Sequence, residues 1–392
     1  MPRFPRLSPS SQGLSNQVFG DLVRRAHQRS GPLYPLHVGD TWLEPVESVQ
    51  RELQRKDHPP GLYRYAPVQG EPCLLDAIED HLQERSGIEI DRECLQVVCG
   101  ATSGLNIVCT TLLDEGDEVI ILAPFWPLIR GIVHSLGAKP VELPLVDRFD
   151  REGFDVGSAL RSVITERTVA IYVNTPHNPT GRVLPRELLD TLAEVALEHD
   201  LWILDDEVYD DLWYTAQAPA PLWTHPRLRE RTIACHSLSK SYGLAGARVG
   251  FVHGPAEFMQ SLRGVQTFLT YCAPRPMQFA ACAALREGQE WLAKARQAYR
   301  DAGHRAAATL GLPPPAGGTF LFFDVSAWLP EGAGDARLFL EACLEEGVLL
   351  TPGAACGRDY ARWVRLCFSV IPPKELNEAV ERVAAVLARG PR

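Results

Sequence analysis

The stretch SLSKSYGLAGARVG, residues 237–250, follows a short apolar run at 232–235 and leads into a second one. A lone lysine in a loop is usually a surface residue, and that interpretation applies to Lys240 until its neighbours are considered. Serines flank it, and a glycine-rich turn leads on to Arg248. Serine hydroxyls and a guanidinium suit a phosphate dianion. A lysine in a partly desolvated crevice beside cations loses its proton readily and can form a Schiff base, so the stretch indicates an anion site next to a reactive lysine.

Outward from this stretch, short apolar runs alternate with helical patterns. The helical spacing of apolar residues predicts helices around 74–82, 105–113 and 185–196. Continuous apolar strands that alternate with helices are typical of a mostly parallel sheet with both faces covered. We therefore predict an α/β fold with a mostly parallel central sheet sandwiched by helices. The apolar runs predict its buried strands at residues 95–99, 119–122, 169–173, 201–204, 232–235 and 249–252.

The C-terminal part of the chain has a different pattern. Residues 276–310 are helical in character, and prolines and glycines at 313–318 then interrupt the helix. Beyond them the pattern predicts a smaller α+β domain, with strands near 319–325 and 363–370 and a helix near 337–346. We predict three parts: an N-terminal segment (1–45) that joins the small domain, a large cofactor-binding domain (46–295) and the C-terminal small domain (296–392).

Composition limits the possible functions. The chain has 392 residues and a formal net charge of -10, which argues against a nucleic-acid-binding surface. A local phosphate site remains possible in such a chain, because helix N-termini and single arginines bind anions. The ten cysteines form no CxxC motif, and we interpret them as reduced thiols without a chemical role. The sequence has neither a secretory h-region nor an apolar run long enough to cross a membrane, so we expect a cytoplasmic protein.

Two further segments follow predicted strands, which is where ligands bind in open parallel sheets. The first is GATSG, residues 100–104, at the start of a helix. Its small residues, free amide groups and helix dipole suit an anion. Taken alone, however, a plain N-cap by Thr102 or Ser103 is the better explanation.

The second segment is DDEVYDD, residues 205–211. Three interpretations of this acidic cluster compete. It is a solvated charge run, a Mg²⁺ site, or the source of one buried carboxylate paired with a cationic heterocycle nitrogen, with Tyr209 near it. A buried carboxylate needs such a partner, or it takes up a proton. The segment alone leaves all three interpretations open.

SLSKSYGLAGARVG resembles the lysine motif of the class I/II aminotransferases, the fold type I family of pyridoxal phosphate (PLP) enzymes. Further motifs of that family follow in the same order over nearly the whole chain: YAPVQG (65–70), GATSG (100–104), PFW (124–126), HNPTG (177–181), DEVY (206–209) and WVRL (363–366). The resemblance implies that Lys240 holds PLP as a Schiff base and then carries a proton between the substrate Cα and the cofactor. Asp206 and Tyr209 are the other implied catalytic residues. The implied cofactor-binding residues are Gly100, Ala101, Thr102, Trp126, Asn178, Asp206, Tyr209, Ser237, Lys240, Arg248 and Tyr65.

The resemblance also assigns roles. Asp206 would keep the pyridine nitrogen protonated so that the ring accepts electrons, while Tyr209 and Asn178 would bond the phenolic oxygen. Trp126 would stack on the ring. The arginine fork of Arg365 would bind the substrate α-carboxylate.

Two consequences follow from these roles. Tyr65 would reach the phosphate of the neighbouring subunit's cofactor, which implies a homodimer. Of the three interpretations of the acidic cluster, the resemblance favours the one in which Asp206 is a buried carboxylate paired with a heterocycle nitrogen. We expect Asp210 and Asp211 to be solvated, and we expect no metal site.

The sequence departs from the family around the expected substrate pocket. LHVGDTWLEP (36–45) resembles the substrate-side loop, with Gly39 at its glycine, but it continues with Asp-Thr-Trp where the family usually has Pro-Asp-Phe. Trp42 either borders the substrate pocket or is an exposed loop residue, and Phe320 is either an apolar wall of the pocket or a core residue. A distal-carboxylate arginine has no evident counterpart, because the register of Arg275 does not fit. Arg365, Gly39, Trp42 and Asn178 are the expected substrate-binding residues.

We therefore predict a PLP-dependent aminotransferase that moves an amino group from a neutral or aromatic amino acid to a 2-oxo acid by a ping-pong mechanism. Another PLP reaction on the same frame, such as a β- or γ-lyase, a cyclase or a racemase, is the alternative, because the shared motifs fix the cofactor and not the reaction. A PLP-binding regulator without turnover is a third hypothesis. The absence of a helix-turn-helix pattern in the 35 residues before Leu36 speaks against it.

Overall fold

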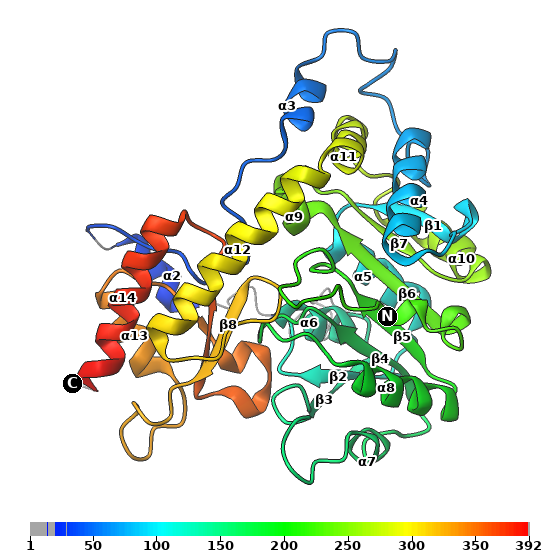
Figure 1. Cartoon of the computed structure of the whole chain (residues 1–392). Helices are drawn as coiled ribbons and strands as arrows, with labels where there is room; N and C mark the ends of the chain where they lie inside the picture. The colour runs from blue at the N-terminus through cyan, green and yellow to red at the C-terminus, as the bar shows by residue number, and fades with distance from the viewer. Residues whose placement is uncertain (1–13, 15–19, 29, 391–392) are drawn as a thin grey trace, which may run out of the picture.

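The computed structural model describes residue 14, residues 20–28 and residues 30–390 (Figure 1). Within this part of the chain, seven strands form one sheet in the order β1-β7-β6-β5-β4-β2-β3. The side chains of the strands other than β3 are buried almost throughout, because these strands are short runs of apolar residues with helices on both sides, whereas most side chains of β3 are half-buried. The strands are β1 (Leu95–Val98), β2 (Glu118–Ala123), β3 (Lys139–Pro144), β4 (Thr168–Asn174), β5 (Trp202–Asp206), β6 (Thr232–Ser237) and β7 (Gly250–His253).

The pairing within this sheet is mostly parallel. The pairs β2·β3, β2·β4, β4·β5 and β5·β6 are parallel, and β7 is antiparallel to both β6 and β1. The predicted α/β fold class is therefore confirmed, and each predicted strand of the sheet is present within one or two residues. β3 was not predicted, because its sequence KPVELP contains two prolines and two charged residues.

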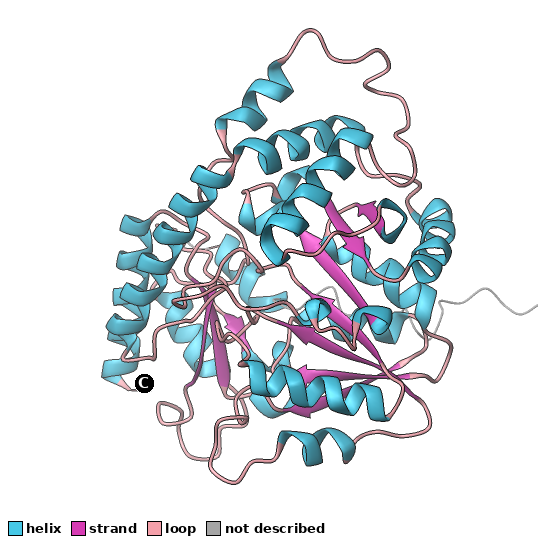
Figure 2. Cartoon of the chain, turned by 45° about the vertical axis from the view of Figure 1, so that its right-hand side comes forward, coloured by secondary structure: helices cyan, strands magenta, loops and turns pink. Residues whose placement is uncertain are grey.

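Helices cover both faces of the large sheet (Figure 2). Apolar residues of α5, α6 and α10 share one core with the inward side chains of β2, β4 and β6. On the opposite face, α4 and α11 cover the β1, β7 and β6 part of the sheet, and α7 and α8 cover the β2, β4 and β5 part. These helices are α4 (Pro72–Ser86), α5 (Ala101–Leu112), α6 (Pro127–Ser135), α7 (Val156–Arg161), α8 (Arg186–Glu198), α10 (Ala256–Leu269) and α11 (Arg275–Glu287).

A second, antiparallel sheet lies beside the first and has the strand order β8-β10-β9. Its strands are β8 (Phe320–Asp324), β9 (Thr351–Pro352) and β10 (Trp363–Cys367). The long helix α12 (Gln289–Leu310) packs against α14 (Pro373–Arg389) next to this sheet, as Figure 1 shows. The remaining α-helices among the described residues are α2 (Gly20–His27), α3 (Glu47–Gln54), the short α9 (Leu238–Ser241) and α13 (Arg337–Glu345).

The described part of the N-terminal segment contacts the second sheet. Tyr34 forms a parallel bridge with Val348, and the Cys367 amide donates to the Leu36 carbonyl at 2.8 Å. The division of the chain at residues 45 and 295 stays a prediction, and its second boundary falls inside α12. Residues 1–13 and 15–19 of the predicted N-terminal segment lie outside the described residues.

Candidate active site

Three neighbouring parallel strands end in polar side chains at one edge of the large sheet. Asn174 closes β4, Asp206 closes β5 and Ser237 closes β6, and Asn174 is the register partner of Asp206. Apolar strand interiors stop at these positions, so the polar residues meet where ligands bind in such sheets. A cavity of about 260 Å³ opens here. It is lined by Gly39, Ala101, Thr102, Leu105, Trp126, Leu128, Asn174, Asn178, Asp206, Val208, Tyr209, Ser237, Ser239, Lys240, Ala245, Arg248, Phe320 and Arg365.

Lys240 reaches this cavity from α9, the short helix after β6. Ser237 caps that helix, since its hydroxyl accepts the Ser239 amide at 3.1 Å. The Lys240 Nζ donates to the Gly39 carbonyl at 2.5 Å and lies 3.8 Å from an Asp40 carboxylate oxygen. Burial lowers the pKa of Lys240, and Arg248 and Arg365 lower it further against the opposing effect of Asp40. These surroundings favour a neutral, nucleophilic amine.

The N-terminus of α5 and Arg248 form an anion cradle at one end of the cavity. Gly100 precedes α5 with a φ of 77°, and a Cβ at this position would lie only 2.5 Å from Nη2 of Arg248. Arg248 has a positive φ of 53° and donates to the carbonyls of Ala245 and Cys99 at 2.9 and 3.3 Å. No carboxylate pairs with its guanidinium in the described part of the chain. Its charge is therefore free for a phosphate beside the free amides of the helix.

Asp206 is a buried carboxylate, 4% exposed, on the cavity wall. Oδ2 accepts a hydrogen bond from the Tyr172 hydroxyl, and Oδ1 accepts one from the Val208 amide at 3.3 Å. Burial raises the pKa of Asp206 to about 6, although these two hydrogen bonds act in the opposite direction. No cationic side chain contacts it within the described residues. A buried carboxylate in this position either pairs with a cation from outside the protein or takes up a proton more readily.

Asn178, Tyr209 and Arg365 lie together on another side of the cavity. The Asn178 amide donates to the Tyr209 hydroxyl at 3.5 Å, and its carbonyl oxygen accepts from Nη1 of Arg365 at 3.0 Å. Nη2 of Arg365 donates to the His37 carbonyl and to the Thr351 hydroxyl at 3.1 and 3.2 Å. The guanidinium is buried, and among the described residues no carboxylate neutralises it. It is placed to bind a carboxylate of a ligand.

The remaining predicted site residues are distributed differently. Trp126 lines the cavity just before α6, and Gly39 lines it from the N-terminal segment. Trp42 is absent from the cavity lining within the described residues, and its indole packs against the large core cluster. Tyr65 also lies outside the lining. It is 81% exposed and contacts the Tyr271 ring at 5.0 Å between centroids.

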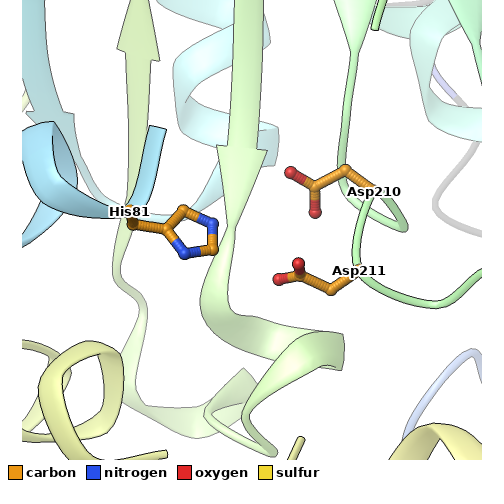
Figure 3. Close-up of side chains that lie close together, drawn as sticks. All are labelled: His81, Asp210 and Asp211. Carbon is orange, nitrogen blue, oxygen red and sulfur yellow. The ribbon is translucent and has the colours of Figure 1, made fainter. Parts of the chain in front are cut away.

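The expectation that Asp210 and Asp211 are solvated is wrong. They are 3% and 7% exposed, and Figure 3 shows them pointing toward His81 of α4, with one ligand atom of each residue within 4.8 Å of the others. Arg85, one helical turn beyond His81, donates to the Asp210 carbonyl at 2.8 Å and to an Asp211 carboxylate oxygen at 3.2 Å. The high charge of the segment predicts exposure, but α4 covers it, and the Arg85 guanidinium of that helix supplies the opposite charge.

Sequence reasoning missed two residues that orient the site. The Asn174 side-chain amide donates to the Asp206 backbone carbonyl at 2.7 Å, and its side-chain oxygen accepts the backbone N–H of Asn178 at 2.8 Å. A polar residue at the end of an apolar strand was the available signal for Asn174. Tyr172 gave no signal, because a tyrosine inside a buried strand is an ordinary core residue.

These features fit pyridoxal phosphate. The cradle at Gly100 and Arg248 suits a phosphate, Lys240 offers an amine, and Asp206 offers a carboxylate of the kind that a cationic ring nitrogen needs. A mostly parallel sheet with this set of groups at its strand ends defines a PLP-dependent enzyme of fold type I.

Comparison with known proteins narrows the class. Residues 33–383 match the family described as aminotransferase class I and II, and the chain belongs to that family. It is 35% identical to the arginine–pyruvate transaminase of Pseudomonas aeruginosa over 336 residues, which is 84% of this chain and 83% of the relative. It is 32% identical to the aspartate/prephenate aminotransferase of Thermus thermophilus, with 91% of each chain covered.

Solved structures agree with this assignment. A Thermus thermophilus aspartate aminotransferase mutant superposes with a TM-score of 0.87 at 29% identity and covers 98% of this chain and 100% of its own. The N-succinyldiaminopimelate aminotransferase of Mycobacterium tuberculosis superposes with a TM-score of 0.88 at 28% identity and covers 97% and 100%. The chain is therefore a PLP-dependent aminotransferase. No helix in the described residues is long and apolar enough to cross a membrane.

Proposed function

We propose that this aminotransferase moves an amino group from a neutral or aromatic amino acid to a 2-oxo acid by a ping-pong mechanism, with Lys240 as the residue that binds the cofactor covalently. One observation carries the proposal. Lys240 shares its cavity with two guanidinium groups, those of Arg248 and Arg365, which have no carboxylate partner among the described residues. One of them suits a phosphate and the other suits a substrate carboxylate.

Different residues of the cavity would bind different parts of the cofactor. Arg248, Ser237 and the α5 amides at Ala101 and Thr102 would hold the phosphate, and the Trp126 ring would face the pyridine ring. When bound, pyridoxal phosphate supplies an electron sink that stabilises negative charge at the substrate Cα.

Three polar residues of the cavity would also hold the pyridine ring. The Asp206 carboxylate would pair with the ring nitrogen and keep it protonated. The Asn178 amide and the Tyr209 hydroxyl, which lie 3.5 Å apart, would donate to the phenolic oxygen. Burial keeps the pKa of the Tyr209 hydroxyl well above its ordinary value, so it stays a donor at neutral pH.

Arg365 and Lys240 would act on the substrate. The Arg365 fork would bind the α-carboxylate, with Asn178 holding the guanidinium in orientation through its 3.0 Å contact. Lys240 would move the Cα proton, because burial beside two cationic groups lowers the pKa of its amine and favours the proton-accepting form. In each half reaction the same amine would accept and return one proton.

The cavity walls support a neutral or aromatic side chain on the substrate. The cations lining the cavity in the described part of the chain are Lys240, Arg248 and Arg365, and each already has a role. Arg275, the other candidate for a second carboxylate, is paired with Glu71 at 2.6 Å and donates to the Gly61 carbonyl. Apolar side chains complete the lining: Leu105, Trp126, Leu128, Val208 and Phe320.

A homodimer in which Tyr65 serves the neighbouring site is also part of the proposal. The exposed aromatic side chains of Tyr63, Tyr65 and Phe268, which are 91%, 81% and 92% exposed, support a contact surface in this region. The roles of Trp42 and Gly39 on the substrate side, the cytoplasmic location and the division into domains stay predictions.

The covalent role of Lys240 is tested by borohydride reduction of the cofactor-loaded protein followed by peptide mass spectrometry. We expect the cofactor on the Lys240 peptide of the natural chain and none on the Lys240→Ala variant. Lys294→Ala is the control, since Lys294 is an exposed residue paired with Glu290 on α12. Cofactor that remains covalently fixed in Lys240→Ala would contradict the assignment.

The substrate class is tested with a panel of amino donors and 2-oxo acid acceptors. Phenylalanine, tyrosine, leucine and alanine should give higher kcat/KM than aspartate by about tenfold or more, since a second carboxylate would enter an uncompensated apolar pocket. A preference for aspartate would contradict the proposed substrate class. Release of ammonia or sulfide without transfer of the amino group would contradict transamination.

A further inference from the structure

Tyr172 is a polar side chain in the buried interior of β4. It lies two residues before Asn174, so both side chains project from the same face of the strand. Across the parallel pair, Tyr172 is the register partner of Leu204, and Asn174 is the partner of Asp206. Its side chain is 2% exposed and packs among apolar residues of the core that α5, α6 and α10 cover.

The Tyr172 hydroxyl donates to the Oδ2 oxygen of Asp206. The other carboxylate oxygen accepts the Val208 amide, and Asn174 holds the Asp206 backbone carbonyl. Tyr172 is therefore the one side chain that bonds this carboxylate among the described residues. It is absent from the cavity lining in the same part of the chain, so it reaches a ligand only through Asp206.

We propose that Tyr172 is a positioning residue for the transamination reaction, which aims the Asp206 carboxylate at the cofactor's ring nitrogen and holds it in its ionised form. The proposal rests on the proposed function, in which Asp206 pairs with that nitrogen. A hydroxyl donor stabilises an anion that burial would otherwise neutralise. It also leaves the oxygen lone pairs that face the cavity free for the ligand.

The groups around the pair favour this direction of the hydrogen bond. Burial, together with the charge of Asp206, holds the pKa of Tyr172 well above its ordinary value, so the phenol stays a donor. Burial does the same for Cys235 on β6 and for Tyr209, which therefore stay neutral next to Asp206. The charge of Asp210 favours protonation of Asp206 and makes the Tyr172 donor more necessary, and Asp205 is a second acidic neighbour that interacts with Asp206.

The test is Tyr172→Phe in the cofactor-loaded enzyme, a change that keeps the ring and removes one hydroxyl. We expect kcat to fall about tenfold, because one hydrogen bond to a charged group is lost. KM for the amino donor should stay within about twofold, because Arg365 is untouched. The acidic limb of the kcat/KM profile should move to higher pH, since Asp206 then takes up a proton more easily. The absorbance band of the bound cofactor should titrate with a shifted midpoint.

A double-variant cycle separates positioning from a structural role. In apoenzyme titrated with pyridoxal phosphate, Tyr172→Phe should weaken binding in the natural chain and have no effect in an Asp206→Asn background. The matched control is Tyr360→Phe, because Tyr360 is also 2% exposed and its hydroxyl also bonds an aspartate, Asp147, at 2.5 Å. Tyr360→Phe should leave the pH profile and the cofactor spectrum unchanged.

The outcomes distinguish this inference from the proposed function. If Lys240 carries the cofactor and transamination proceeds, but Tyr172→Phe leaves kcat, pH profile and spectrum unchanged, the positioning role is wrong and the proposed function stands. An equal loss of cofactor affinity in the Asp206→Asn background would also overturn it, since Tyr172 would then act independently of Asp206. If the Lys240→Ala test fails, the proposed function itself is wrong.

Discussion

The buried carboxylates of the acidic segment 205–211 lie on two sides, and the two sides differ in whether a cationic side chain pairs with them. On the cavity side, Asp206 is buried and receives only neutral hydrogen-bond donors in the described part of the chain. On the side that faces α4, Asp210 and Asp211 are equally buried, but Arg85 contacts both at 3.8 and 3.2 Å between carboxylate and guanidinium. On the cavity side, the Asp206 charge has no cationic partner in the described part of the chain and is available to a ligand. On the side that faces α4, the charges of Asp210 and Asp211 are paired with Arg85.

Histidines complete the side that faces α4. His236 Nδ1 lies 2.9 Å from an Asp210 carboxylate oxygen, and its Nε2 lies 3.1 Å from Nε2 of His253. Burial opposes ionisation of Asp210, but Arg85 and the hydrogen bond to His236 outweigh it and lower its pKa to about 2. Buried acids therefore indicate function only where the protein lacks the opposite charge.

The largest expected effect comes from a substitution of Asp206 on the cavity side. In the proposed function, Asp206→Asn removes the charge that would keep the ring nitrogen protonated, and kcat should fall by about 1,000-fold, measured by stopped-flow absorbance. The free energy of unfolding of the cofactor-free protein should stay the same or rise, because a buried carboxylate without a cation is removed. Asp206→Glu is the control, because it keeps the negative charge but places the carboxylate on a longer side chain. An Asp206→Asn enzyme with normal kcat would exclude the pairing with the ring nitrogen.

The two sides also differ in how well the sequence predicts them. Lys240 and Asp206 follow apolar runs, so the general rule for parallel sheets brings them to one edge, and the structure does place them in one cavity together with Arg248. Trp42 belongs to an irregular loop, whose path depends on contacts with Ser369 and the second sheet. Local sequence contains no information about such contacts.

The α4 side could not be predicted for a related reason. Arg85 lies more than 120 positions from Asp210, and nothing in the helix pattern of α4 says which charged segment it will cover. The same holds for Tyr172, since only the pairing of β4 with β5 reveals that its hydroxyl meets Asp206. Elements follow from periodicity, but pairings between distant side chains follow from the packed fold.

The second prediction concerns the ion pairs of Arg85 on the side that faces α4. Arg85→Leu leaves Asp210 and Asp211 without their cation, and the free energy of unfolding should fall by about 3–5 kcal/mol, measured by urea denaturation. Among active molecules, kcat should change much less than in Asp206→Asn, because Arg85 does not line the cavity. Arg161→Leu is the control, since its pair with Glu198 is exposed and should contribute little. An Arg85→Leu protein as stable as the natural chain would contradict internal charge matching.

The third prediction sharpens the comparison through pH. Burial raises the pKa of Asp205 to about 7, and it raises that of Asp206 to about 6 in the cofactor-free protein. Both folded-state values lie above the unfolded one, so the folded state binds more protons, and stability should fall as pH rises through this window. Asp205→Asn should reduce the fall between pH 5 and 8 by about 1–2 kcal/mol with or without cofactor.

Added pyridoxal phosphate should remove only the contribution of Asp206 to the fall in stability with rising pH. The reason is that a cationic ring nitrogen then stabilises the ionised form of Asp206. Urea unfolding at several pH values, with and without the cofactor, measures both parts. A slope that the cofactor leaves unchanged would show that Asp206 gains no cation on binding. A slope that Asp205→Asn leaves unchanged would show that Asp205 is ionised across the window.

The smallest expected effect concerns metal ions at His81, Asp210 and Asp211 (Figure 3). Dialysis against a chelator, or addition of Mg²⁺ or Zn²⁺, should shift the unfolding midpoint by less than about 1 °C, because a divalent ion would have to displace the guanidinium of Arg85 from both carboxylates. His81→Gln should be equally insensitive to metal. A stabilisation of several degrees by one ion, lost in His81→Gln, would mean that a metal and not Arg85 balances this side. The segment would then depend on an external cation on both of its sides, and the contrast between them would disappear.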